Sequence, residues 1–134
     1  RFTITEAFEN NEIFYTDGNG RQQMTRRRNK RSDYNYVYSE EPVSSNYYPV
    51  TNRIMIRDET TKLELAVLTD RPQGGSSLKE GVVELMVHRR DTKDDGFGVA
   101  EVLNEQQYGK GLYARGQHYL TVGKLETGKC VFGF

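Results

Sequence analysis

Residue types that mark several common functional classes are scarce in this 134-residue chain. It has no tryptophan, a single cysteine and only two histidines, His88 and His118, which lie thirty positions apart. A catalytic zinc site usually takes three protein ligands and keeps one position open. No His-x-Asp or His-x-x-x-His spacing occurs here, and scattered carboxylates are the only other candidates. The sequence therefore predicts no metal site formed by this chain alone.

Nucleophilic catalysis and phosphate binding are equally unsupported by motifs. Ser76 and Ser77 do not lie in a Gly-x-Ser-x-Gly elbow. The preceding Gly74-Gly75 pair is not followed by the Lys-Ser/Thr helix start of a phosphate-binding loop. Cys130 has no reactive setting; it fits either a small buried side chain in a last strand or a disulfide to a partner chain.

Long apolar runs and a net charge are also missing. Without an apolar run of about 18 residues, no membrane-spanning helix is expected. The 19 basic and 19 acidic residues cancel, so the net charge points to neither nucleic acid nor a membrane surface. One basic run, residues 26–31, fits either phosphate binding or a charged edge strand that resists pairing with other sheets. We favour the edge strand because the chain is neutral overall.

What the sequence does contain is a series of short extended segments. They are predicted at 2–8, 12–21, 34–40, 47–58, 63–70, 82–91, 111–123 and 129–134, with turns at 17–20 and 58–62 and a Gly/Ser-rich loop at 71–81. Leu63, Leu65 and Val67 share one face of their segment, whereas Lys62 and Glu64 point the other way. Helical periodicity is absent. This pattern predicts an all-β fold, an antiparallel β-sandwich.

The chain contains no internal repeat and no linker that would divide it. Residues 1–134 are therefore expected to form a single β-sandwich domain or part of one. The chain opens on Arg1 and stops within the strand-like segment "CVFGF". We expect a fragment or a processed piece of a longer protein.

The segment 82–91 ends in a dense cluster of polar and charged residues, His88-Arg89-Arg90-Asp91, which is followed by Asp94 and Asp95. If the strand alternation continues to its end, Arg89 follows Val83, Leu85 and Val87 on the core-facing side. Its stem would pack while its guanidinium projects past the core. Held by Asp94 or Asp95, that group would serve as a structural clamp or donate to sugar hydroxyls or a carboxylate. Pattern alone favours the clamp.

Three of these stretches together resemble a known family. "NYYPVTNRIMIRD", "LELAVLTDRPQGGSSLKEGVVELMVHRR" and "DDGFGVAEVLNE" are similar to the C-terminal β-sandwich region of the lysosomal-type α-mannosidases, glycoside hydrolase family 38. The upstream "IFYTDGNGR" with its arginine run also resembles the strands that precede this region. The resemblance covers about residues 12–105.

The resemblance implies retaining hydrolysis of terminal α-mannose on N-glycans by a zinc-dependent enzyme. It places the zinc ligands, the Asp nucleophile and the carboxyl general acid outside this chain. It implies that Arg89 or Arg90 reaches the mannose at a domain junction, and the strand alternation favours Arg89. His88, Asp91, Asp94 and Asp95 would then support that arginine, with His88 ligating no zinc. The implied partners are other chains or domains of the same enzyme and mannose-containing glycans, in the lysosome or outside the cell.

One position departs from the family pattern. After Asp94-Asp95-Gly96 the family usually continues with Arg-Gly, whereas this chain has Phe97 before Gly98. A cation is thereby lost from the expected junction. Two other hypotheses stand beside the mannosidase subunit: a non-catalytic β-sandwich that binds carbohydrate or protein, and a structural domain whose charged strand ends are satisfied internally.

Overall fold

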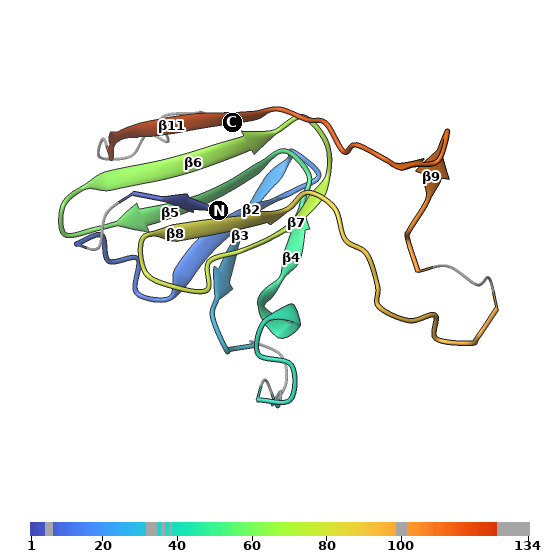
Figure 1. Cartoon of the computed structure of the whole chain (residues 1–134). Coiled ribbons are helices and arrows are strands. Elements are labelled where there is room, and N and C mark those ends of the chain that lie inside the picture. The colour runs from blue at the N-terminus through green and yellow to red at the C-terminus, as the bar shows by residue number, and fades with distance from the viewer. Residues whose placement is uncertain (5–6, 32–34, 36, 38, 99–101, 126–134) are drawn as a thin grey trace.

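The computed structural model describes residues 1–4, 7–31, 35, 37, 39–98 and 102–125. Two antiparallel sheets face each other in it, as the ribbon in Figure 1 shows, so the predicted all-β sandwich is confirmed. The helical structure within the described ranges is one 3-10 turn, Ser44–Asn46. No helix in that part of the chain is long and apolar enough to cross a membrane.

Within the described residues, the larger sheet has five strands and the smaller one four. The order in the larger sheet is β11 (His118–Lys124), β6 (Leu63–Thr69), β5 (Arg53–Asp58), β2 (Ile13–Gly18) and β3 (Gln22–Arg27). The order in the smaller sheet is β1 (Phe2–Thr3), β8 (Val82–Met86), β7 (Gln73–Ser76) and β4 (Tyr48–Val50). A separate hairpin joins β9 (Gln106–Gln107) to β10 (Lys110–Gly111).

The core lies between the sheets and follows the strand alternation. The larger sheet contributes Phe14, Ile54, Ile56, Leu65 and Val67 to it, and the smaller sheet contributes Val50 and Val83. The predicted shared face of Leu63, Leu65 and Val67 is thus confirmed. β-Branched and aromatic side chains of this kind pack well on a pleated surface, which explains why these segments form strands.

Glu64 points away from this core, as expected, yet it is buried. Its Oε2 lies 2.6 Å from Nε of Arg57, its cross-strand neighbour on β5. The Arg57 guanidinium in turn lies 4.9 Å from the centroid of the Tyr15 ring. A buried carboxylate needs such a partner, because leaving it unpaired away from water is costly.

The two predicted turns are confirmed, and each closes a hairpin. Asn19 and Gly20 both have positive φ between β2 and β3, and the Arg21 N–H donates to the Gly18 carbonyl at 3.0 Å. This is the geometry that fits the twist of paired strands. Residues 59–62 form the second turn, between β5 and β6.

The arginine run begins on an edge strand, as favoured from the sequence. β3 is the last strand of the larger sheet and carries Arg26 and Arg27. Arg28 follows it, and its Nη2 lies 2.9 Å from the Glu80 carboxylate. The Arg26 guanidinium instead lies 4.4 Å from the centroid of the Tyr48 ring. Contacts within the sandwich therefore engage these cations.

The prediction of a loop over 71–81 was wrong for part of that segment, because Gln73–Ser76 form β7 in the middle of the smaller sheet. Gly75, one of the two glycines that suggested a loop, is instead needed for packing. A Cβ built on Gly75 would lie 2.6 Å from Cγ2 of Val50, on the neighbouring strand β4, and 3.1 Å from Cδ1 of Ile54, on the larger sheet. The strand therefore has glycine where side chains of both sheets leave no room for a Cβ.

Replacing Gly75 with alanine is expected to destabilise the fold by about 1 to 3 kcal/mol, the usual cost of overpacking a core. Chemical denaturation of the purified protein would measure it. Gly111→Ala is the matched control, since nothing lies within 4 Å of a Cβ built there. Equal stability of the two variants would contradict the packing argument.

The predicted segment 47–58 is divided into β4 and β5 by a corner at Thr51-Asn52. Asp17, buried at the end of β2, binds this corner: its Oδ1 accepts the N–H groups of Thr51, Asn52 and Arg53 at 2.9, 2.8 and 2.9 Å, and its Oδ2 accepts that of Gly20 at 2.8 Å. Burial alone would raise the pKa of Asp17, but these backbone donors outweigh it and lower the pKa.

Asp58 plays the same part at the turn after β5. It is buried, and its carboxylate accepts the N–H groups of Thr60 at 2.8 Å, Thr61 at 3.0 Å and Glu9 at 3.3 Å. The hydrogen bond from Thr61 is the largest cause that lowers the pKa of Asp58. A folded pKa below the unfolded value of about 3.9 favours the charged form in the fold.

The contribution of Asp58 to stability is therefore present above about pH 4 and is lost as the pH falls through its folded pKa. We expect Asp58→Asn to be less stable than the parent at pH 7, with the difference shrinking as the pH approaches about 2. Denaturant unfolding of both proteins across this range measures it. A stability difference that does not change with pH would contradict the assignment.

Three predicted segments lie wholly or partly outside the described residues. The segment 2–8 lacks residues 5 and 6, residues 34–40 are described only at 35, 37 and 39–40, and residues 129–134 are not described. The two interpretations of Cys130 fall in the last segment and stay predictions.

Candidate functional site

The cluster of charged residues after β8 does not lie within a strand. It lies on a long stretch of chain that leaves the sandwich and returns to it, here called the excursion. β8 ends at Met86, whereas the sequence predicted a strand to Asp91. Its ladder with β7 ends there: Gly74 opposite Met86 is the last pair, although β7 itself continues by one residue to Gln73. Residues 87–98 and 102–117 then lead away from the sandwich and return to β11, a course visible at the right of Figure 1.

Because β8 ends at Met86, strand alternation can no longer be used to place Arg89 on the core-facing side. Val87 is exposed, and so are His88, Arg89 and Arg90, so Arg89 does not continue the core-facing row of Val83 and Leu85. That expectation was wrong, because alternation needs a partner strand to hold the pleat. Which of the two arginines faces a ligand must be judged from the loop itself.

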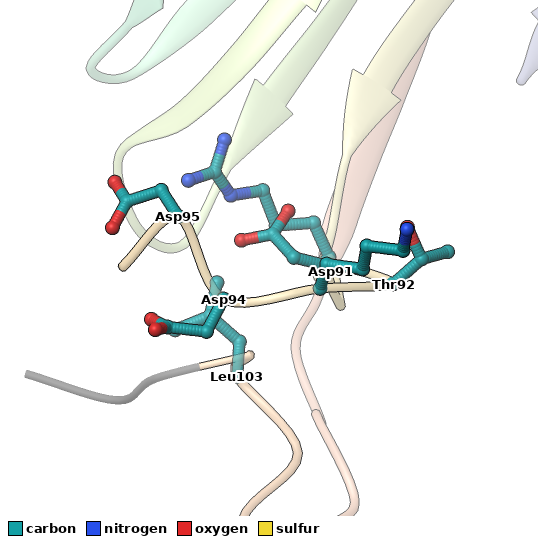
Figure 2. Close-up of a pocket in the computed structure, with 7 residues that line it drawn as sticks. Asp91, Thr92, Asp94, Asp95 and Leu103 are labelled. Atoms are coloured by element: carbon teal, nitrogen blue, oxygen red, sulfur yellow. The ribbon is translucent and has the colours of Figure 1, made fainter. Parts of the chain in front are cut away.

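The loop forms a hollow of about 520 Å³ that includes Arg89 and not Arg90. Its lining is polar and charged: Arg89, Asp91, Thr92, Lys93, Asp94, Asp95 and Leu103. Figure 2 shows the carboxylates of Asp91, Asp94 and Asp95 along the turn of the chain, with Leu103 arriving from the returning segment. Four of the six predicted site residues therefore come together at one place: Arg89 with these three aspartates.

Asp94 and Asp95 do not hold an arginine in this structure. Asp94 Oδ2 accepts the Gly96 N–H at 3.0 Å, and Asp95 Oδ1 accepts the Phe97 N–H at 3.0 Å. Among the described residues, no ion pair joins either carboxylate to Arg89 or Arg90. Asp side chains that bind a backbone N–H two residues on stabilise a turn. The predicted internal clamp is thus replaced by two carboxylates that shape the loop.

The remaining predicted residues lie near the hollow but outside its lining. His88 and Arg90 flank Arg89 in the chain and are exposed to solvent. Phe97, at the position where the resemblance led us to expect arginine, is 93% exposed. The outgoing and returning segments are joined where the Asp91 N–H donates to the Val102 carbonyl at 3.0 Å. The hollow thus lies at a narrow point of the excursion.

The base of the excursion is fixed to the sandwich by residues that sequence reasoning missed. Asp70 and Arg71, just after β6, form an ion pair with 3.1 Å between Nε and Oδ1. Asp70 Oδ2 accepts the Gln117 N–H at 2.9 Å, and the Arg71 guanidinium donates to the Arg115 carbonyl. The hydrogen bond from Arg71 is the main cause that lowers the pKa of Asp70.

His118 completes this anchor. Its Nε2 lies 2.7 Å from Gln73 Oε1, an ordinary hydrogen-bond distance, and its ring packs edge-on against Phe2 with centroids 5.6 Å apart. A signal for the anchor existed in the sequence: an Asp-Arg pair directly after a strand. No local pattern in the sequence indicated that residues 115–118 return to this Asp70-Arg71 pair.

A second, shallower hollow of about 420 Å³ lies on the smaller sheet. It is mostly apolar and is lined by Tyr47, Tyr48, Pro49, Pro72, Gln73, Gly74 and Met86. Gly74 has no side chain, so its strand forms the floor beneath Tyr47, whose Cδ1 would lie 3.4 Å from a Cβ at this position. Its lining has no carboxylate or cation, so it offers fewer groups for catalysis than the first hollow.

No group of three or more His, Cys, Asp or Glu side chains within the described ranges is arranged to hold a metal ion. The aspartates of the loop do not form such a group, and the carboxylates of Asp94 and Asp95 each accept a backbone N–H of their own turn. Zinc therefore does not fit the described part of this chain.

Comparison with known proteins gives concordant matches. The model of the glycosyl hydrolases family 38 C-terminal domain matches residues 3–97. The lysosomal alpha-mannosidase of Bos taurus is 53% identical over 115 residues, which are 86% of this chain and 11% of the relative. That of Homo sapiens is 54% identical over 114 residues, 85% of this chain and 11% of the relative. The alpha-mannosidase of Canavalia ensiformis is 44% identical over 131 residues, 93% of this chain and 13% of the relative.

Proposed function

Because this chain belongs to the C-terminal domain family of the family 38 glycosyl hydrolases, we propose that it works as one part of an α-mannosidase. It spans only about 11% of the length of its lysosomal relatives, so the catalytic unit is larger than this chain. The reaction is hydrolysis of terminal α-mannose on N-glycans and glycoproteins, and the site of action is the lysosome, as the names of those relatives suggest. The identity of more than half of the matched residues supports this proposal.

The proposed role of this chain is to present Arg89 to the mannose at a junction with another part of the enzyme. The exposed guanidinium has five N–H donors in a planar fork and always carries a charge. Hydrogen bonds from it to sugar hydroxyls are charge-assisted and hence strong. In the oxocarbenium-like transition state of glycoside hydrolysis such contacts strengthen, and only interactions of that kind accelerate the reaction. Arg90 is the alternative donor on the same loop.

The neighbouring residues have a positioning role in this proposal. Asp94 and Asp95 fix the turn after Arg89 through their bonds to Gly96 and Phe97. Asp91 fixes the narrow point of the loop through its backbone. His88 precedes the arginines and lies on the exposed side of the loop. Their function is to keep the guanidinium in one place, because donors that need no reorganisation stabilise a transition state best.

The acid–base and nucleophilic steps belong to other parts of the enzyme in this proposal. A retaining glycosidase needs two carboxyl groups that flank the scissile bond, one as nucleophile and one as general acid. The zinc ion expected for the family would bind there too, with ligands outside the described residues of this chain. This chain contributes binding and orientation of the sugar.

The test is to purify the longer protein that contains this chain from its natural source and to assay it with a chromogenic α-mannoside. Intact mass and zinc analysis of the same fractions accompany the assay. Activity and zinc that co-elute with this chain support the proposal. A chain that elutes without activity or zinc would overturn it and would leave carbohydrate or protein binding as the function.

A further inference from the structure

The sandwich-facing side of β11 is open to solvent, unlike that of its neighbour. Leu120 is paired with Val67 on β6, and Val122 is paired with Leu65. Paired residues point to the same side of a sheet. Val67 and Leu65 are 0% and 3% exposed, whereas Leu120 and Val122 are 54% and 57% exposed. On this face of the sheet, the side chains of β6 are therefore buried and those of the adjacent strand β11 are exposed.

The cause is that, among the described residues, the opposite sheet has one strand fewer. Its last strand on this side is β1, which within the described part of the chain pairs only with β8. β1 reaches the first residue of β11, as the contact between Phe2 and His118 shows. It has two residues and does not extend over Leu120 and Val122.

The space beside β1 and over Leu120 and Val122 is suited to an additional β-strand. Its floor is the pair of aliphatic side chains on β11, and its side is the outer edge of β1, whose backbone groups have no ladder partner among the described residues. An uncovered edge of this kind is a template for pairing with a further strand. Added strands gain affinity from the backbone bonds and specificity from alternate side chains.

We propose that a β-strand from another part of the same mannosidase polypeptide adds to the outer edge of β1 and covers Leu120 and Val122. The inference rests on the proposed function, which makes this chain one part of a longer enzyme. Because the chain spans about 11% of its relatives, most of that enzyme lies outside it. The added strand presents apolar residues to β11 at alternate positions and completes a five-on-five sandwich.

An intramolecular strand fits this position better than a second copy of the chain. Leu120 and Val122 face the interior of the sandwich, so their cover must enter the layer of the smaller sheet. β1 offers an edge of only two residues, which is too short to hold two separate chains together by its own backbone bonds. A strand tethered to the same polypeptide meets a much higher effective concentration and needs less pairing surface.

The experiment compares two lysine substitutions on β11 within the longer enzyme. Leu120→Lys places a charge in the proposed contact, and Tyr119→Lys places one on the opposite face of the same strand. The control is closely matched, because Tyr119 is 57% exposed and Leu120 is 54% exposed here. The measurements are the thermal midpoint, the yield of folded enzyme and hydrogen exchange of residues 1–4 and 118–124.

We expect Leu120→Lys to lower the folded yield by about tenfold or more, or the thermal midpoint by roughly 5 °C or more, as burial of an unpaired charge requires. Tyr119→Lys should change both only slightly. In the unmodified enzyme, residues 1–4 should exchange slowly, since the edge of β1 is then paired. The added strand itself is identified by crosslinking from Val122→Cys, followed by mass spectrometry.

Equal effects of the two lysines, together with rapid exchange of residues 1–4, would overturn the inference. A dimer that Leu120→Lys dissociates would also overturn it, because a second copy would then be the occupant. Mannosidase activity is assayed separately on the unmodified protein. An active enzyme with equal lysine effects refutes the strand while leaving the proposed function intact. An inactive protein in which only Leu120→Lys is harmful refutes the function instead.

Discussion

Arg89→Ala is expected to lower turnover of the assembled enzyme on α-mannosides by about 10²-fold or more, the usual loss when one oriented donor is removed from a transition state. Because Arg89 is exposed and has no ion pair with a described acidic residue, the fold should be unaffected. Steady-state kinetics with a chromogenic mannoside measure the effect. Circular dichroism and the thermal midpoint verify the fold.

Arg90→Ala is the matched control, since it removes the same group from the next position of the same loop. Arg89 lines the hollow and Arg90 does not, so the larger loss should occur at Arg89. If only Arg90→Ala is impaired, the adjacent arginine is the donor. Full activity of both variants would refute a role of this loop in the mannose site and would leave a structural role for the pair.

Asp17→Ala should destabilise the fold by about 3 kcal/mol, because it leaves several partly or fully buried backbone N–H groups at one corner without an acceptor. Four of these groups bind the Asp17 carboxylate at 2.8 to 2.9 Å. Such a loss corresponds to a drop of roughly 10 °C in the thermal midpoint of a domain of this size. Denaturant unfolding or calorimetry of the purified protein measures it.

Asp95→Ala is the control for this substitution. Its carboxylate also accepts a backbone N–H, that of Phe97, but it lies on an exposed loop where water replaces the lost bond. We expect a change within about 0.5 kcal/mol. If Asp17→Ala unfolds no more readily than Asp95→Ala, then Asp17 does not hold the corner between β4 and β5.

Local sequence pattern predicted β2, β5 and β6 of the larger sheet well. It indicated β3 only through the arginine run, and β11 begins at His118, well inside the predicted segment 111–123. Alternation over Leu63–Thr69 and the turn residues Asn19 and Gly20 act over short range, so they determine a strand and its hairpin without reference to the rest of the chain. The same reasoning failed at Gln73–Ser76, where glycine indicated a loop. Glycine is required there by the closeness of Val50, a residue some 25 positions earlier, which no local pattern reveals.

The candidate site was predicted in part. Pattern singled out the charged residues after β8, and the resemblance assigned their role. The structure gathers Arg89 with Asp91, Asp94 and Asp95 around one hollow. Alternation nevertheless assigned Arg89 to the core-facing row of Val83 and Leu85, although the pairing of β8 with β7 ends at Met86. The length of a strand depends on its partner, and the partner is set by the fold.

By itself, the sequence determined the all-β class, the hairpins of the larger sheet and membership in a family through motifs that extend over most of the chain. These properties depend on residue order and short-range preference. Only the tertiary structure decided which side chains meet across the sandwich: Asp17 with the corner at Thr51, and Asp70 with the returning segment at Gln117. It also revealed the open face at Leu120 and Val122. Contacts between residues distant in the chain follow from how two sheets are stacked, and that information is not contained in any single segment.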